Sequence, residues 1–239
     1  MRKHEIQIEI AASPDKVWEA LSTGQGISSW FAPIASVEPG VGGKTHIKWA
    51  EGMEASPNIE VWEPNQHLRT TSDRPAPAPP NVVDYYIEGS GGTTVMRLVH
   101  SGFGAGADFD DEYNSTGGAW PVFLKMMKHS VERGVSSCRN VTVLRVLNEP
   151  ADAAWEKLLP AASANLKGSI QRHFDPVGHV GCFELPEWGG AMVSIFCEKC
   201  GGITALTVAN LLYDVSAAQA DSVRECWSGI LHKTFGEES

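Results

Sequence analysis

The chain has 239 residues, of which 42% are hydrophobic and 20% are charged, and its formal net charge at pH 7 is −10. This composition is typical of a folded globular protein rather than a disordered one. The sequence contains no apolar run of about 18 residues that could cross a membrane as a helix. Neither half contains a basic run that would attract a phosphate backbone. We therefore expect no membrane span and no nucleic-acid partner.

The start of the chain and the distribution of its cysteines indicate in which cellular compartment the protein is expected. Residues 1–6 lead directly into an alternating pattern and contain no apolar core of a signal peptide. All five cysteines lie in the second half, and an odd number is not typical of a disulfide scaffold. These features predict a cytoplasmic protein.

The first predicted elements are a strand and two helices. Isoleucines alternate with polar residues from His4 to Ala12, which predicts a half-buried strand. Ser13 and Pro14 then favour a helix start, as the N-cap and the first helical residue. We expect a helix over residues 14–22 and a second short helix over residues 27–31.

Short β-prone runs separated by Gly, Pro and Asn follow these helices. Their close spacing favours an antiparallel meander over parallel strands with helical crossovers. A proline-rich run over residues 75–80 lacks the N–H groups of a sheet ladder, so we expect a stiff loop there. A docking motif for a proline-recognising partner is the alternative. The predicted strands cover residues 35–38, 44–49, 58–63, 67–72, 82–88 and 93–100.

A long helix is predicted after the last of these strands. Residues 108–112 form an acidic lead-in, which suits a helix N-terminus. Gly134 is the expected terminator. One face of about four turns is marked at helical spacing by Trp120, Phe123, Met127 and Val131.

The second half repeats this order in shortened form. A strand over residues 139–147 precedes a helix that begins near Pro150, and a last helix is capped by Ser216. Between these helices we expect strands over residues 169–174, 179–185, 191–198 and 203–213.

Tryptophans mark equivalent positions in the two halves. Trp18 and Trp155 occupy matching places in the two first helices, and Trp120 and Trp227 correspond in the two last helices. The second half lacks a counterpart of the second short helix. The repeat indicates an internal duplication.

Two motifs resemble a known family. The segment Ser13–Leu21, followed by Ser29-Trp30-Phe31, looks like the opening of START-like (Bet v 1-like, SRPBCC) proteins. The subgroup is the one related to the C-terminal domain of the activator of Hsp90 ATPase. The segment Leu98–Phe103, followed by Gly118-Ala119-Trp120 and Leu124, is similar to the ending of that subgroup.

The resemblance implies an α+β helix-grip fold. In this fold a curved antiparallel sheet wraps around a long C-terminal helix, and an apolar cavity lies between the sheet and the helix. We expect a tandem of two such domains, a START-like one over residues 1–135 and a degenerate, shortened one over residues 136–239. The side chains expected to line the cavity and bind a ligand, each of which could equally be ordinary core, are Trp30, Phe31, Trp49, Trp62, Tyr85, Met96, His100, Trp120, Phe123 and Met127.

His100 is the polar residue of greatest interest in the first half. It lies at the end of a predicted strand that faces the long helix, and it could act as an acid or a base near neutral pH. The sequence offers no obvious orienting carboxylate, and Ser101 points to the opposite face of the strand. A structural role, in which His100 bonds the loop over residues 102–106, is therefore favoured.

Four residues of the second half have nearly the spacing of a zinc site, namely His179, Cys182, Cys197 and Cys200. In a hairpin centred near Trp188, His179 lies opposite Cys197, whereas Cys182 lies opposite Ser194. Cys182 is then about 10 Å along the strand from the other ligands, too far for one tetrahedral site. We expect no metal here. Two alternatives stay open, a cluster of His179, Cys197 and Cys200 and a redox-active Cys197/Cys200 pair.

The favoured function is non-catalytic binding of a small hydrophobic molecule in the cavity. Two other classes stay open. One is a protein-interaction module that contacts a chaperone, and the other is a cavity enzyme of cyclase or hydrolase type that uses His100. Stimulation of Hsp90 is disfavoured, because the activator relies on a separate N-terminal domain and the match begins here at residue 4. The sequence assigns no catalytic residue, cofactor or oligomeric state.

Overall fold

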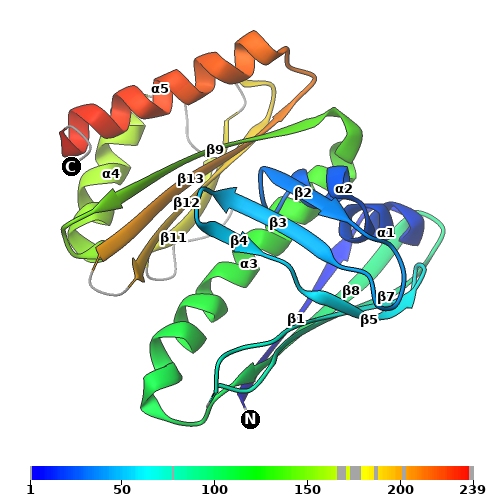
Figure 1. The fold of residues 1–239 in the computed structure, drawn as a ribbon. Helices are drawn as coiled ribbons and strands as arrows, with labels where there is room; N and C mark the ends of the chain where they lie inside the picture. Colours follow the sequence, from blue (N-terminus) through cyan, green and yellow to red (C-terminus); the bar gives the residue numbers. More distant parts are fainter. Residues whose placement is uncertain are drawn as a thin grey trace. The chain divides into compact units, whose positions relative to one another are not determined.

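The structure, a computed structural model, describes residues 2–76, 78–165, 171–172, 179–185, 188–200 and 203–236. The chain divides into two compact units, residues 1–136 and residues 137–239. In each unit an antiparallel sheet packs against a long helix, as Figure 1 shows. The predicted α+β class, with a second and smaller sheet-and-helix unit, is confirmed.

The first unit contains a five-stranded sheet with the strand order β1-β8-β7-β6-β5. A three-stranded sheet of order β2-β3-β4 adjoins it, and the amide of Thr45 donates to the carbonyl of Pro57 at 3.0 Å between them. The strands are β1 (Arg2–Ile10), β2 (Ile34–Val37), β3 (Thr45–Ala50), β4 (Met53–Ala55), β5 (Asn58–Glu63), β6 (His67–Ser72), β7 (Asn81–Ser90) and β8 (Thr93–Phe103).

Helix α3 (Asp110–Arg133) closes the first unit after a 3-10 turn, η1 (Ala107–Phe109). It ends at Gly134, whose φ of +104° confirms the predicted terminator. The predicted N-terminus at the acidic lead-in is confirmed, because Asp110, Asp111 and Glu112 form the first turn. The predicted four turns of apolar face cover only the second half of the 24 residues. Asn114–Gly118 and Pro121 have low helix propensity, and no apolar pattern marks the first half.

Three further expectations are corrected near the start of the chain. The helix α1 (Pro14–Ser22) forms as predicted, but the side chain of Ser13 makes no capping bond to it. It bonds to Asp15 instead and lowers the pKa of that carboxyl group. The second short helix, α2 (Gly24–Ser28), begins three residues earlier than expected. Strand β4 was not predicted at all, because three residues are too short for a periodic pattern.

The second unit contains a five-stranded sheet with the strand order β10-β11-β12-β13-β9. It follows a 3-10 turn, η2 (Val135–Ser137). Its helix α5 starts with the predicted cap, a capping box made by Ser216 and Gln219. The predicted strand over residues 169–174 lies largely outside the described residues. The elements are β9 (Cys138–Leu147), α4 (Ala151–Asn165), β10 (Gln171–Arg172), β11 (Val180–Leu185), β12 (Ala191–Cys200), β13 (Ile203–Tyr213) and α5 (Ala217–Phe235).

Both faces of the second sheet are apolar. Val193, Ile195 and Cys197 of β12 belong to the core under α4 and α5. Their neighbours Met192 and Phe196 point to the opposite face and are also buried. A strand that is buried on both faces has a near-continuous apolar sequence, which explains the run from Ala191 to Cys197.

One polar contact occurs in the same place in both units. The last strands β8 and β13 each have eleven residues, and the eighth residue is His100 in one and Asn210 in the other. The indole N–H of Trp120 donates to His100 Nδ1 at 2.8 Å, and that of Trp227 donates to Asn210 Oδ1 at 2.7 Å. The correspondence of the two tryptophans therefore extends to the buried acceptors of their indole protons.

Candidate functional site

Phe31 lies at the centre of a cluster of aromatic rings inside the first unit. Its ring is parallel to that of Trp120, with the centroids 5.8 Å apart. It also meets Phe123 at 4.8 Å and Trp49 at 5.3 Å edge-on, and Trp30 at 5.0 Å. Five of the predicted cavity residues thus form one cluster between the sheets and α3.

A small cavity adjoins this cluster. Its volume is about 40 Å³, whereas pockets that enclose a drug-sized ligand measure roughly 300 Å³ or more. The predicted residues Trp30, Phe31 and Tyr85 contribute to its wall. The other lining residues, which sequence analysis missed, are Leu21, Ile27, Thr45, Ile47, Pro57, Leu68 and Thr70.

The remaining predicted residues lie apart from this cavity. Met96 and Met127 are fully buried and fill the core between the sheet and α3. Trp62 faces inward but packs edge-on against Trp18 of α1, with the centroids 5.0 Å apart. A β-bulge between Ile59 and Val61 sets the direction of Trp62 on β5.

His100 has a protein partner on each ring nitrogen. Nδ1 accepts the indole proton of Trp120, so the ring proton belongs on Nε2, which donates to Asn81 Oδ1. The pKa of His100 is lowered to about 4, mainly by burial, with smaller contributions from the positive charges of His4 and Arg74. The imidazole is therefore neutral near pH 7 and has no free lone pair for proton abstraction. This geometry favours the structural role over acid–base catalysis.

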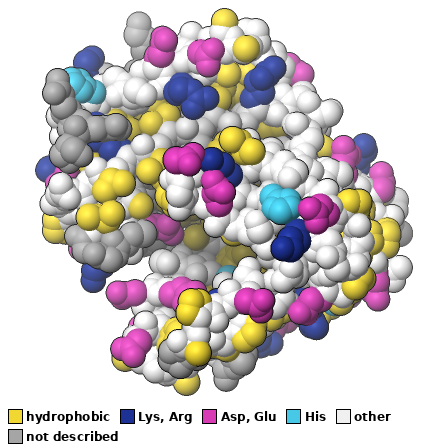
Figure 2. All heavy atoms as spheres, viewed as in Figure 1, with side chains coloured by type: hydrophobic (Ala, Val, Ile, Leu, Met, Phe, Trp, Pro, Cys, Tyr) yellow, Lys and Arg dark blue, Asp and Glu magenta, His cyan; other side chains and the backbone are white. Residues whose placement is uncertain are grey.

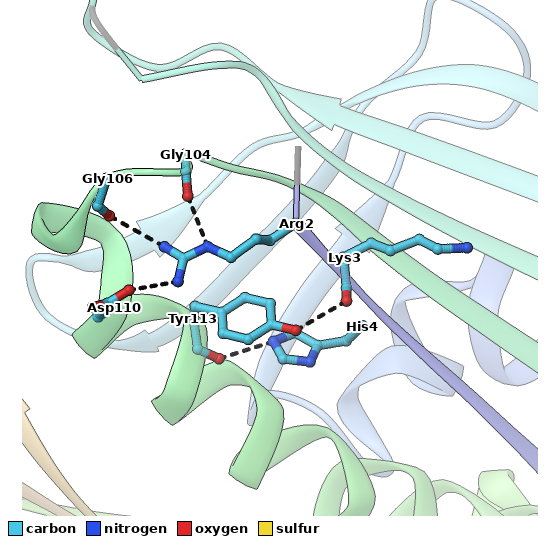
Figure 3. A network of polar contacts seen from close by, with 7 residues as sticks. All are labelled: Arg2, Lys3, His4, Gly104, Gly106, Asp110 and Tyr113. Carbon is cyan, nitrogen blue, oxygen red and sulfur yellow. Dashed lines mark hydrogen bonds and ion pairs between the residues drawn. The ribbon is translucent and has the colours of Figure 1, made fainter.

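A second polar network holds the start of α3 against β1, as Figure 3 shows. The guanidinium of Arg2 donates to the carbonyl of Gly104 at 2.8 Å and pairs with Asp110 at 2.5 Å. His4 Nε2 lies 2.8 Å from the carbonyl of Tyr113, and the two rings stack with centroids 4.1 Å apart. These contacts fix the exposed first turns of α3, whose own residues are poor helix formers.

Among the described side chains, His179, Cys182 and Cys197 form no metal-binding cluster. Cys182 pairs with Ser194, and the amide of Cys197 donates to the carbonyl of His179 at 2.8 Å, so the predicted register is confirmed. No group of three or more His, Cys, Asp or Glu side chains suited to a metal occurs among the described residues. Burial raises the pKa of the Cys197 thiol to about 12, with a further contribution from Glu198. The side chain of Cys200 lies outside the described residues.

The sheet–helix core of the second unit is nearly filled. A cavity of about 10 Å³ remains beside Trp227. A larger, polar cavity of about 430 Å³ lies near the start of α4, away from this core. Its charged groups pair with one another or with close neighbours, His179 with Asp152 and Glu149 with Lys157 at 2.5 Å. An apolar ligand therefore finds a better match in the first unit.

Charge and hydropathy add two observations. On the face drawn in Figure 2, lysine and arginine side chains lie among acidic and neutral ones and form no broad basic patch. Within the described residues, no helix is long and apolar enough to cross a membrane.

Several solved structures are similar to parts of this chain. A protein from Mesorhizobium loti, MLL2253, is 25% identical over 55% of this chain and 98% of its own, with a TM-score of 0.49. The Aha1 dimer from Colwellia psychrerythraea is 23% identical over 55% and 97%, with a TM-score of 0.48. DynU16, from the dynemicin biosynthetic locus, is 15% identical over 95% and 94%, with a TM-score of 0.47. No curated protein matches the chain.

The family model described as Activator of Hsp90 ATPase homolog 1-like protein matches residues 11–132, which are 122 of the 239 residues. This range begins at the end of β1 and ends one residue before the end of α3. It includes the aromatic cluster and the whole lining of the small cavity. The chain belongs to the family of Activator of Hsp90 ATPase homolog 1-like proteins, within the Bet v 1-like (SRPBCC) superfamily.

Proposed function

We propose that the first unit binds a small hydrophobic molecule between its sheets and α3 without transforming it. The observation that carries this proposal is the cavity beside Phe31, whose wall is mainly apolar and aromatic. The neutral, fully bonded His100 supports binding over catalysis.

The ligand takes the place of the Phe31 ring in this proposal. The ring is only partly buried, although its neighbours Trp30 and Trp120 are almost fully buried. Phe31 follows the short helix α2 and belongs to neither sheet. Rotation of this one ring joins the small cavity to the space that the ring vacates.

Methyl NMR of the full chain tests the proposal, with resonances of Leu21, Ile27 and Ile47 as reporters of the cavity wall. Toluene, benzyl alcohol and acetophenone serve as neutral probes. We expect saturable shifts of these methyl groups with at least one probe, and a larger affinity for Phe31→Ala, which enlarges the cavity. Absence of shifts from all three probes, in the native chain and in Phe31→Ala, would rule out ligand binding at this place.

A second candidate function is contact with a chaperone of the Hsp90 type, which the family description suggests. Three large apolar side chains are exposed on the small sheet and its first loop, namely Ile34, Val41 and Met53. Pull-down of purified Hsp90 by the full chain tests this function. Retention that is lost in Ile34→Asp/Val41→Asp supports it, and no retention by the unmodified chain contradicts it.

A further inference from the structure

Three hydroxyl groups line the small cavity of the first unit, and they belong to Thr45, Thr70 and Tyr85. These residues are only 5%, 9% and 8% exposed. No side-chain hydrogen bond within the described part of the chain involves these three hydroxyls, and none of them is among the fully enclosed polar atoms without a partner. The hydroxyls are therefore accessible from the cavity and free to bond to a polar group that enters it.

The hydroxyls come from both sheets of the unit. Tyr85 on β7 lies directly opposite Leu68 of β6, and Thr70 follows two residues later on the same face of β6. Thr45 begins β3 of the small sheet. The three groups therefore approach the cavity from separate strands and surround it, rather than lying in a row along one strand.

The cavity wall carries no charge. Among the described residues that line it there is no Lys, Arg, His, Asp or Glu. Burial raises the pKa of Tyr85, so this hydroxyl keeps its proton and can both donate and accept. An anionic ligand would be desolvated here without a countercharge, which is costly. Neutral hydroxyls instead suit a neutral carbonyl or hydroxyl group.

The volume sets the size of the group that enters. A water needs roughly 10–15 Å³ of such space, so about 40 Å³ accommodates the polar end of a molecule and not its whole body. The body would then lie against Trp30 and in the place of the Phe31 ring. Flat apolar groups pack well on these aromatic surfaces.

We propose that this cavity recognises the polar end of an uncharged alcohol or carbonyl compound, whose apolar body replaces the Phe31 ring. This inference rests on the proposed function and adds the chemical class of the ligand. It makes Thr45, Thr70 and Tyr85 specificity-determining residues, and the aromatic cluster a source of apolar contact alone.

The test compares four probes of one ring size in the full chain by methyl NMR, namely benzyl alcohol, acetophenone, toluene and benzoate. We expect the alcohol or the ketone to bind at least about tenfold more tightly than toluene, and benzoate to bind most weakly. Tyr85→Phe and Thr70→Val should each weaken binding of the preferred probe about three- to tenfold. Binding of toluene should stay unchanged in both variants.

Thr71→Val is the matched control. The hydroxyl of Thr71 is buried without a partner, but this residue points to the other face of β6 and does not line the cavity. We expect it to leave all affinities unchanged. Because the hydroxyls of Thr70 and Tyr85 have no partner in the described chain, their removal should also leave the thermal midpoint unchanged or higher, which guards against unfolding as a cause.

The outcomes separate this inference from the proposed function. If toluene or benzoate binds as well as the neutral polar probes, or if Tyr85→Phe and Thr70→Val bind the ketone and the alcohol normally, the ligand class is wrong and hydrophobic binding stands. If none of the neutral probes shifts the cavity methyl groups, the proposed function itself fails.

Discussion

At the level of single residues, His100 illustrates how the core of the first unit controls protonation. The ring accepts one bond from Trp120 and donates one to Asn81, and it is only 7% exposed. Protonation at Nδ1 would break the bond to the indole and would place a charge in the core. Both costs favour the neutral form in the folded state.

This histidine should make stability depend on pH in the mildly acidic range. Its pKa is about 4 in the folded chain and about 6.5 in the unfolded chain. As the pH falls below 6.5, the unfolded state takes up the proton first, so stability is complete above pH 6.5 and is lost towards pH 4. The loss amounts to roughly 3 kcal/mol.

Urea unfolding at pH 7 and pH 4.5 measures this effect. His100→Gln removes the titrating group and should lose less stability than the unmodified chain between these two values. The carboxyl groups of the two proteins are the same, so their contribution cancels in the comparison. Equal losses in both proteins would show that His100 is not responsible.

Asn210 has the corresponding position in the second unit and is fully buried. Its oxygen accepts the indole proton of Trp227, and its amide nitrogen donates to the carbonyl of Val141 at 3.0 Å. Asn210→Leu should destabilise the chain by about 2–4 kcal/mol, because it leaves a buried donor unpaired. Thr207→Val on the same strand is the control and should change stability by less than about 0.5 kcal/mol.

A double-mutant cycle measured by urea unfolding attributes the loss to the indole. In a Trp227→Phe background there is no indole proton to satisfy, so Asn210→Leu should cost clearly less than in the native background. The same cost in both backgrounds would assign the effect to the bond with Val141 or to packing.

At the level of elements, α3 is stabilised by tertiary contacts that offset its weak first half. Gly117 is a glycine within the helix, and a Cβ atom there would lie only 2.7 Å from Cε1 of His4. The close approach allows His4 to reach the carbonyl of Tyr113. This glycine therefore serves the contact between helix and strand at the expense of helix propensity.

Gly117→Ala should consequently destabilise the native chain, although alanine favours a helix by about 1 kcal/mol. In a His4→Ala background the clash is absent, and the same substitution should stabilise the chain by up to about 1 kcal/mol. Chemical denaturation of the four proteins measures both effects. Stabilisation in both backgrounds would contradict the packing explanation.

The elements also show what the sequence can and cannot predict. Strands β5 and β6 begin and end as expected, and the register of β11 with β12 was predicted, because alternation and hairpin geometry are local properties. The acidic lead-in located the start of α3, but no apolar pattern marks its first half, which is stabilised by contacts with β1, a hundred residues earlier. Propensity alone would give too short a helix.

The candidate site was partly predictable, because some of its residues lie in a local periodic pattern and others do not. The aromatic cluster follows from periodicity, which places Trp120 and Phe123 on the inner face of the helix. Thr45 and Thr70 have no such signal, because a threonine in a strand is an ordinary β-former. Their place at the site becomes visible only in the structure, where strands of two sheets bring these threonines to the wall of one cavity.

At the level of the whole molecule, the two units differ in how their sheets are built. The outer face of the first sheet carries charged residues, such as Glu5 and Arg97, which lie 3.3 Å apart. In the second sheet the corresponding face carries Met192 and Phe196, which are at most 4% exposed. A sheet with two apolar faces cannot be solvated on either side.

The first unit should fold when it is produced alone. We expect residues 1–136 to unfold cooperatively as a monomer, because one compact unit contains its complete sheets, helix and core. Light scattering after size-exclusion chromatography measures the oligomeric state of this fragment, and urea titration measures its cooperativity. An unfolded or aggregated fragment would contradict this expectation.

The repeated tryptophan contact has a consequence for spectroscopy. The indole protons of Trp120 and Trp227 are bonded to buried acceptors, one in each unit. Such protons exchange with solvent only when the surrounding core opens. With the two indole resonances assigned, a single hydrogen-exchange experiment on the intact chain would time the opening of each unit separately, without cutting the chain or attaching a label.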